Sequence, residues 1–190
     1  MKINRQGKSR VLDKDQLDLL IDALPTHKHK MVALVCRRTA CRISESIQLR
    51  WENVTAGGIQ FPKEICKGKL KSRLVPISDD FYQILQDWKN KCEIAGESIN
   101  QKDYLFKGRY QNSHLSSRAF QKVLNVAVIE SGMIGFSSHG FRRSGLTAAS
   151  NKNVPLEHIR QISGHSDLGT LQRYLSVSDQ QLKAAALAMD

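Results

Sequence analysis

An ordered series of polar residues in the last third of the chain constrains its fold more than any other feature. The series is His139, Arg142, His165 and Tyr174. His139 and Arg142 are three residues apart, so a helix would place both side chains on one face, where they can reach one ligand together. Tyr174 follows His165 by nine residues and lies near the end of the chain, which suits a nucleophile that has to move.

A short helix is expected between the two halves of this series. Pro155 suits its first turn, and Gly164 suits the left-handed position beyond its last turn. That helix would present His165 at its C-terminal edge. Each sign is weak alone, because Gly-His after a helix is often only a cap with a histidine at the helix's negative end, and a tyrosine near a C-terminus is usually a half-buried amphipathic side chain.

The order and spacing of the series resemble the second motif box of the tyrosine recombinases, the phage integrase family. That box has H-x-x-R, then Gly-His-Ser, then a tyrosine nine residues after the histidine. The family's first box, T-G-L-R-I-S-E followed by L-x-W, is similar to the segment from Thr39 to Trp51, in which Arg42 and Glu45 match in register. Ala40 and Cys41 depart from the usual Gly-Leu. Without the second box, a surface arginine on an amphipathic helix would be the better interpretation of Arg42.

A strand-like hairpin follows the first box, and its loop is the most basic stretch of the chain. Residues 59–65 and 73–77 predict a β-hairpin or a small three-stranded sheet. Taken alone, the loop lysines would be a solvated charge run that protects a sheet edge. In the family this hairpin carries the catalytic lysine, and K-G-K-L-K-S-R-L-V-P from Lys67 matches that pattern with about one extra residue. Lys67 is therefore preferred, with Lys69 as the second candidate.

The resemblance implies DNA cleavage without a metal ion, a cofactor or ATP. Tyr174 would attack the scissile phosphate to give a 3′-phosphotyrosyl link, while Lys67 would protonate the departing 5′-hydroxyl. His139 would assist proton transfer at the tyrosine. Storing the bond energy in the covalent link would let a second 5′-hydroxyl reverse the step on a new partner.

The remaining family residues would bind the phosphate. Arg42 and Arg142 would clamp it, because planar guanidinium groups suit phosphate better than ammonium groups do. His165 would hydrogen-bond a phosphate oxygen. Further cations are expected to contact DNA: Lys63, Lys69, Lys71, Arg73, Arg118 and Arg143. At Arg143 the family more often has a second histidine, so an altered neighbour contact is expected there.

The charge balance also favours a polyanionic partner. Lys and Arg number 29 against 18 acidic residues, which gives a net charge of +11 and predicts attraction to nucleic acid. Charge alone is equally compatible with a basic protein that has no nucleic-acid role. Aromatic residues make up 6% of the chain and fall mostly at apolar helical positions, which gives little support to an RNA-binding domain that stacks bases. Double-stranded DNA is the expected partner.

The fold implied by the resemblance is α+β and mainly α-helical, a catalytic domain with a small antiparallel β-sheet. We expect a flexible basic arm over residues 1–11, the catalytic domain over 12–175 and a C-terminal helix over 176–190. That helix either packs on its own domain or docks into a neighbouring subunit. We expect no N-terminal core-binding domain of the kind most members have in this chain, which would then be either a catalytic fragment of a longer integrase or a naturally single-domain recombinase. The expected assembly is a monomer in solution and a homotetramer on DNA.

Local signals place several of the helices. Asp13 and Gln16 form a predicted capping box before a first helix, and a second helix is expected over about 29–38. Asp79 and Asp80 are expected to cap another, a further helix should cover about 117–131, and Ser178 begins the predicted C-terminal one.

The four cysteines show no metal-binding spacing and are expected to be reduced thiols. Neither a signal peptide nor a membrane-spanning run is present, so a cytoplasmic protein without a membrane partner is expected. Two other functions stay open. A type IB topoisomerase would share the chemistry but relax supercoils without exchanging partners, and a non-catalytic regulatory descendant would bind DNA but lack an essential residue.

Overall fold

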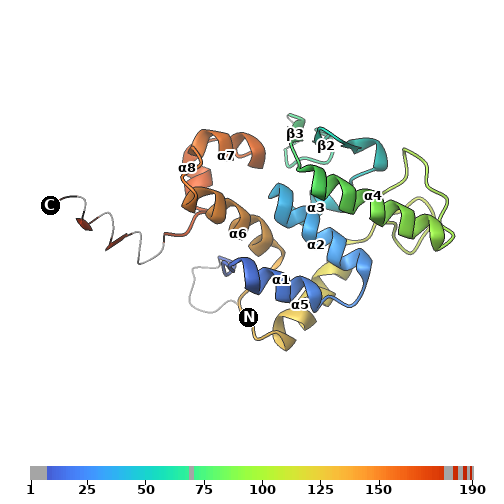
Figure 1. The fold of residues 1–190 in the computed structure, drawn as a ribbon, viewed down its shortest axis with the longest axis horizontal. Coiled ribbons are helices and arrows are strands. Elements are labelled where there is room, and N and C mark those ends of the chain that lie inside the picture. The colour runs from blue at the N-terminus through green and yellow to red at the C-terminus, as the bar shows by residue number, and fades with distance from the viewer. Residues whose placement is uncertain (1–7, 69–70, 178–181, 184–185, 188, 190) are drawn as a thin grey trace.

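The computed structural model describes residues 8–68, 71–177, 182–183, 186–187 and 189. Among these residues the architecture is α+β and mainly helical, as expected, with one small antiparallel sheet at one side of the helices (Figure 1). In chain order the elements are α1 (Lys14–Asp22), α2 (His27–Thr39), α3 (Ile43–Ser46), the 3-10 turn η1 (Trp51–Asn53), β1 (Val54–Thr55), β2 (Gly58–Phe61), β3 (Arg73–Val75), α4 (Asp79–Ile94), α5 (Ser117–Glu130), α6 (Ser138–Asn151), α7 (Leu156–Ser163) and α8 (Leu168–Gln172).

Helix α2 lies at the centre of the fold. It packs against α1, α3 and α6, and its residues Val32, Val35 and Cys36 have no exposed surface. Figure 1 shows α2 with the sheet and α4 to one side and α6 to the other. Because α2 ends at Thr39, the segment that carries Arg42 begins where the side of the sheet and the side of α6 meet.

The predicted helix starts are largely confirmed. Asp13 accepts a hydrogen bond from the backbone N–H of Gln16 (2.9 Å) and donates its own to the Gln16 side chain (3.3 Å), which is the capping box expected before α1. The start of α4 differs by one residue. Ser78 caps it, and Asp79 and Asp80 occupy its first turn, where carboxylates favour the positive end of the helix dipole.

The sheet has three strands in the order β1-β2-β3, all antiparallel. Its strands end earlier than predicted, β2 at Phe61 and β3 at Val75, and Phe61 faces Arg73 in the register. Residues 62–72 connect these two strands, and Lys69 lies outside the described residues. Helix α7 packs against β3, so the end of α7 lies beside the hairpin.

The first residues that the structure describes contact α6. Residues Lys8–Leu12, here called the N-terminal strap, lie along the start of this helix. The backbone N–H of Arg10 donates to Gly135 O (2.9 Å), and Ser9 Oγ accepts from the N–H of Ser137 (3.0 Å). Local sequence does not reveal such long-range hydrogen bonds.

The chain after α8 packs first against the body and is then exposed. Tyr174 and Leu175 contact a small apolar cluster that includes Leu146 of α6 and Ile159 of α7. The capping box predicted at Ser178 lies outside the described residues. Further along, the described apolar side chains are exposed: Leu182 by 59%, Leu187 by 64% and Met189 by 85%.

In the part of the chain that the structure describes, none of the helices has the length and apolar character needed to span a membrane.

Candidate active site

Arg142 is the buried centre of the site. It has no exposed surface, although it is an arginine in the first half of α6. Its Nη1 donates to Ala40 O (2.7 Å), at the C-cap of α2, and its Nη2 donates to Ser163 O (2.8 Å), at the last residue of α7. C-terminal carbonyls lack partners within their own helix and carry the negative end of its dipole. One guanidinium therefore joins the ends of two helices.

Burial and, after it, the nearby charge of Arg42 together lower the pKa of Arg142 to about 10. The guanidinium is still protonated at neutral pH. Its Nε is buried and has no hydrogen-bond partner among the described residues. A buried N–H without an acceptor costs roughly 1–3 kcal/mol. This donor is thus left over for an oxygen that enters the site.

Arg42 is held by a buried glutamate that the sequence matched to the first box without giving it a role. Glu45 has no exposed surface and accepts from Arg42 Nη1 (2.8 Å), from the Arg42 backbone N–H (3.0 Å) and from Arg73 Nη2 (2.6 Å). Burial raises the pKa of Glu45, but the charge and hydrogen bond of Arg73, together with the hydrogen bonds of Arg42, outweigh burial and leave the pKa lowered. The side chain of Arg42 stays 17% exposed, so part of its guanidinium can meet a ligand.

His165 follows the left-handed Gly164 (φ +68°), as the sequence predicts. Its Nδ1 lies 2.7 Å from Ser163 Oγ, and its Nε2 lies 3.1 Å from Arg142 Nη2. The Ser163 hydroxyl donates to Arg160 O, so it accepts from His165 Nδ1–H, and Nε2 accepts from Arg142. Burial lowers the pKa of His165 to about 4, and the charges of Arg142 and Arg42 contribute. The imidazole is therefore neutral.

Tyr174 lies against this cluster two residues after the end of α8. Its ring centroid is 4.8 Å from that of His165 and 5.6 Å from Arg142 Cζ. It also lines a cavity of about 400 Å³ together with His139, which is exposed, and Arg143. The structure thus brings Tyr174 together with His165 and Arg142 by direct contact, and with His139 across this cavity.

The other sequence-predicted residues differ in their surroundings: some are exposed, one pairs with Glu45, and one is hydrogen-bonded within the protein. Lys63, Lys67, Lys71 and Arg118 are exposed, and no described hydrogen bond or ion pair joins Lys67 to the buried cluster. Arg73 is turned inward onto Glu45. Arg143 donates to backbone and hydroxyl groups of the protein. Contact of any of these with DNA stays a prediction.

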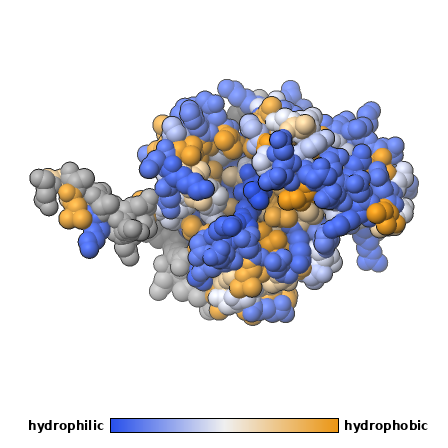
Figure 2. Space-filling model, viewed as in Figure 1, coloured by the Kyte–Doolittle hydropathy of each residue, from blue (hydrophilic) through white to orange (hydrophobic). Residues whose placement is uncertain are grey.

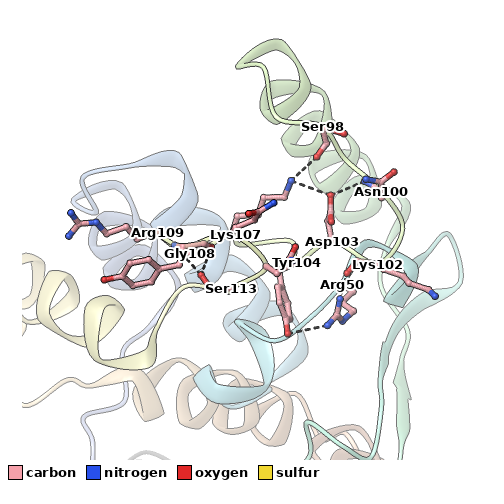
Figure 3. A pocket seen from close by; sticks show the side chains of 13 residues that line it. Arg50, Ser98, Asn100, Lys102, Asp103, Tyr104, Lys107, Gly108, Arg109 and Ser113 are labelled. Atoms are coloured by element: carbon pink, nitrogen blue, oxygen red, sulfur yellow. Dashed lines mark hydrogen bonds and ion pairs between the residues drawn. The ribbon is translucent and has the colours of Figure 1, made fainter.

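A second cavity, of about 640 Å³, lies in the loop between α4 and α5 (Figure 3). Two of its four cations fix the loop: Arg50 donates to Tyr104 Oη (3.1 Å) and lies over the Tyr104 ring, and Lys107 binds Ser98 O (2.6 Å) and Asp103 (3.2 Å). Because these groups already have partners, the cavity is a weaker candidate for the functional site than the cluster around Arg142.

Comparison with known proteins gives a consistent result. The model of the Phage integrase family matches residues 10–181. Tyrosine recombinase XerD of Oceanobacillus iheyensis is 26% identical over 180 residues, which cover 91% of this chain and 59% of that protein. The XerA recombinase crystal structure matches 95% of this chain and 65% of its own with a TM-score of 0.76 at 19% identity. The catalytic domain of bacteriophage HP1 integrase matches 88% of this chain and 87% of its own with a TM-score of 0.66, also at 19% identity.

These structural similarities confirm the expected fold, that of a recombinase catalytic domain with a small sheet. The chain spans less than two thirds of the curated relatives that it matches, at 59%, 56% and 61% of the length of three of them.

Proposed function

Because this chain belongs to the phage integrase family, we propose that it is the catalytic part of a site-specific recombinase that cleaves and rejoins double-stranded DNA. The observation that carries the proposal is the position of Tyr174, whose ring contacts both His165 and Arg142. A phenol beside a buried guanidinium and a neutral imidazole is suited to attack on a phosphodiester, since the cation can stabilise the charge that develops on the non-bridging oxygens.

In the proposed step the Tyr174 oxygen attacks the scissile phosphorus and the bond to the 5′-oxygen breaks. The electron pair of that bond stays on the 5′-oxygen, which takes a proton from Lys67, and His139 accepts the phenol proton. The product is a 3′-phosphotyrosyl link and a free 5′-hydroxyl. Attack by a 5′-hydroxyl on this link reverses the step, so neither a metal ion nor ATP is required.

The phosphate would be held by Arg42 and Arg142, with the free Nε of Arg142 as one donor. His165 cannot donate from Nε2 in its present tautomer, because that nitrogen accepts from Arg142. A phosphate oxygen that takes over the Arg142 hydrogen bond would release Nε2, and a proton moved there would make His165 a second donor. In this proposal DNA binding changes the hydrogen bonding of the site.

The proposed assembly is a monomer in solution and a homotetramer on DNA. Its support is the exposed apolar character of Leu182, Leu187 and Met189 at the C-terminal end. Exposed apolar side chains on a terminal segment favour docking into a second copy over solvation.

The test is covalent capture of the intermediate. The protein is mixed with nicked suicide duplexes made from DNA that flanks its own coding region, and the native protein is compared with Tyr174→Phe on a denaturing gel. A slow band that survives detergent, disappears with protease and is absent from the variant is expected. Absence of the band with the native protein, when DNA binding is intact, would contradict the proposal. A band without strand exchange would point to a DNA-relaxing enzyme.

A further inference from the structure

Arg143 follows Arg142 in α6, but its guanidinium contacts the segment that carries the tyrosine. Its Nε donates to the backbone oxygen of Tyr174 (2.9 Å), and its Nη2 donates to Ser176 Oγ (2.6 Å). One of these hydrogen bonds is made to the peptide group of the tyrosine itself, and the other to a side chain two residues later. They fix the main chain from which the phenol projects.

The third nitrogen of the same guanidinium contacts the N-terminal strap, where Nη1 donates to Ser9 O (2.5 Å). The strap is itself anchored to α6, since Ser9 Oγ accepts from the Ser137 N–H and the Leu12 N–H donates to Ser144 Oγ (3.0 Å). Arg143 therefore joins three segments that are far apart in the sequence: the strap, α6 and the tyrosine segment.

The strap also forms part of the space beside the phenol. Lys8 and Ser9 line the 400 Å³ cavity together with His139, Arg143 and Tyr174. A displacement of the strap would thus change both a wall of this cavity and the acceptor at Arg143 Nη1. The position of Tyr174 and the position of the strap are therefore linked through the side chain of Arg143.

Arginine suits this three-way bridge better than lysine or histidine does. A guanidinium spreads its donors over three nitrogens in a rigid plane, whereas the three N–H donors of lysine leave from one nitrogen and histidine has two nitrogens. The family resemblance leads one to expect histidine at this position, so the bridge depends on the residue that this chain has instead.

We infer that Arg143 is a positioning residue, which places Tyr174 for attack and makes that placement depend on the N-terminal strap. The inference rests on the proposed function, because that function makes Tyr174 the nucleophile. It differs from the expectation that Arg143 contacts DNA, since the three nitrogens here donate to protein oxygens. A misplacement of about 1 Å costs on the order of 100-fold in rate, so a loosened bridge has a measurable effect.

The experiment compares the native chain with Arg143→Lys, Arg143→Ala and the control Arg37→Lys. Arg37 is a partly buried arginine of α2 that pairs with Asp18 of α1, so the control makes the same arginine-to-lysine change in an ion pair away from the site. Four quantities are measured: the single-turnover rate of covalent adduct formation at saturating nicked duplex, the Kd for DNA, its salt dependence and the melting temperature.

Arg143→Lys keeps the positive charge but loses the planar guanidinium with its three donor nitrogens. The expected result is a 10- to 100-fold slower adduct formation with Kd within about twofold and an unchanged salt slope, while Arg37→Lys behaves as native. A native rate for Arg143→Lys would overturn the inference. A loss confined to Kd, with a salt slope reduced by about one in Arg143→Ala, would also overturn it and assign a phosphate contact.

Hydrogen exchange in the DNA-free protein separates this inference from the proposed function. The Ser176 N–H donates to Thr147 Oγ1 of α6 (3.3 Å), so the peptide covering residues 172–177 reports how firmly the tyrosine segment is held. Arg143→Lys should speed exchange there by at least about fivefold without changing exchange in α2. If the native protein forms no adduct, the proposed function fails, and unchanged exchange in this peptide would overturn the positioning role by itself.

A double-variant cycle tests the part played by the strap. Ser9→Ala removes the acceptor for the Ser137 N–H and should slow adduct formation less than Arg143→Lys does. If both act through one bridge, the double variant loses less than the product of the two single losses. Losses that multiply would show that the strap and Arg143 act separately, which overturns the coupling.

Discussion

The surroundings of His165 keep its imidazole neutral, so the free energy of unfolding depends on pH through this residue. Burial, followed by the charges of Arg142 and Arg42, lowers its pKa from the usual 6.5 to about 4. Between these two values the unfolded chain binds a proton that the folded chain does not. The folded state therefore loses stability as the pH falls from about 6.5 to about 4, by at most roughly 3 kcal/mol.

Replacing this histidine should flatten that part of the pH profile. The variant His165→Gln is expected to be less stable at pH 7, because it disturbs the contacts with Arg142 and Ser163, and to lose less stability than the native chain between pH 6.5 and 5. Urea unfolding at several pH values measures both quantities. The exposed His158→Gln serves as the control, and a native slope in His165→Gln would contradict the assignment.

The identity of the general acid can be tested by changing the leaving group. Lys67 is exposed on the hairpin, so its substitution by alanine should leave folding intact. We expect Lys67→Ala to slow cleavage about 100- to 1,000-fold with normal DNA. With a duplex that carries sulfur in place of the bridging 5′-oxygen, the leaving thiolate needs no proton and the rate of the variant should return to near native.

Lys69→Ala provides the matched comparison for this experiment, and cleavage rates are measured with both duplexes. A loss in Lys69→Ala that the sulfur duplex restores, with Lys67→Ala unaffected, would move the role to Lys69. A loss in Lys67→Ala that sulfur does not restore would assign Lys67 to phosphate binding instead.

Among the elements, the end of α2 carries a backbone strain that bears on the site. Ala40 adopts a left-handed conformation (φ +50°, ψ +25°), which costs a residue with a Cβ about 1 kcal/mol or more. The position is also where the family usually has glycine. Ala40 stays in place because its carbonyl accepts from Arg142 and its methyl packs against Leu146 and Ile159.

The variant Ala40→Gly is therefore expected to have nearly the stability of the native chain. Relief of the left-handed strain, about 1–2 kcal/mol, offsets about 0.8 kcal/mol for one buried methyl group and about 0.5–1 kcal/mol for the added freedom of the unfolded chain. Ala148→Gly, the same change at an exposed position inside α6, has no such strain to relieve and should cost about 1 kcal/mol. Thermal or urea unfolding of both variants measures the two costs, and an Ala40→Gly variant destabilised as much as Ala148→Gly would refute the argument.

The elements also show what the sequence reveals and what it does not. The capping box at Asp13 and the left-handed Gly164 are local devices, so their patterns predict the start of α1 and the end of α7 correctly. The strap and its link to Arg143 depend on hydrogen bonds between residues more than a hundred positions apart, as from Arg143 to Ser9. Local pattern carries no information on such pairs.

The same distinction applies to the candidate site. Arg42, Arg142, His165 and Tyr174 were found through motif spacing, and the structure brings them into one cluster. The inward turn of Arg73 onto Glu45 was not predicted, because a basic residue in a basic hairpin is more simply interpreted as exposed. Its signal in the sequence was only the unassigned glutamate of the first box.

For the whole molecule, the governing property is its charge. The net charge is +11, and hydrophilic side chains cover most of the face that Figure 2 shows, with apolar patches scattered between them. Several of the cations of the site are paired within the protein, as Arg42 and Arg73 are with Glu45. The exposed lysines are therefore the main source of long-range attraction to DNA.

Binding of duplex DNA should accordingly be weak and steeply dependent on salt. With six to ten phosphate contacts, the affinity would fall by roughly 10³- to 10⁵-fold between 50 and 200 mM salt. Lys63→Gln and Lys71→Gln should each lower the slope of log K against log salt by about one, because each removes one phosphate contact. Lys30→Gln is the control, since Lys30 pairs with Asp22 of α1. Fluorescence anisotropy with a labelled duplex measures these slopes. An affinity that stays constant with salt would mean that base contacts, and not counterion release, hold this domain on DNA.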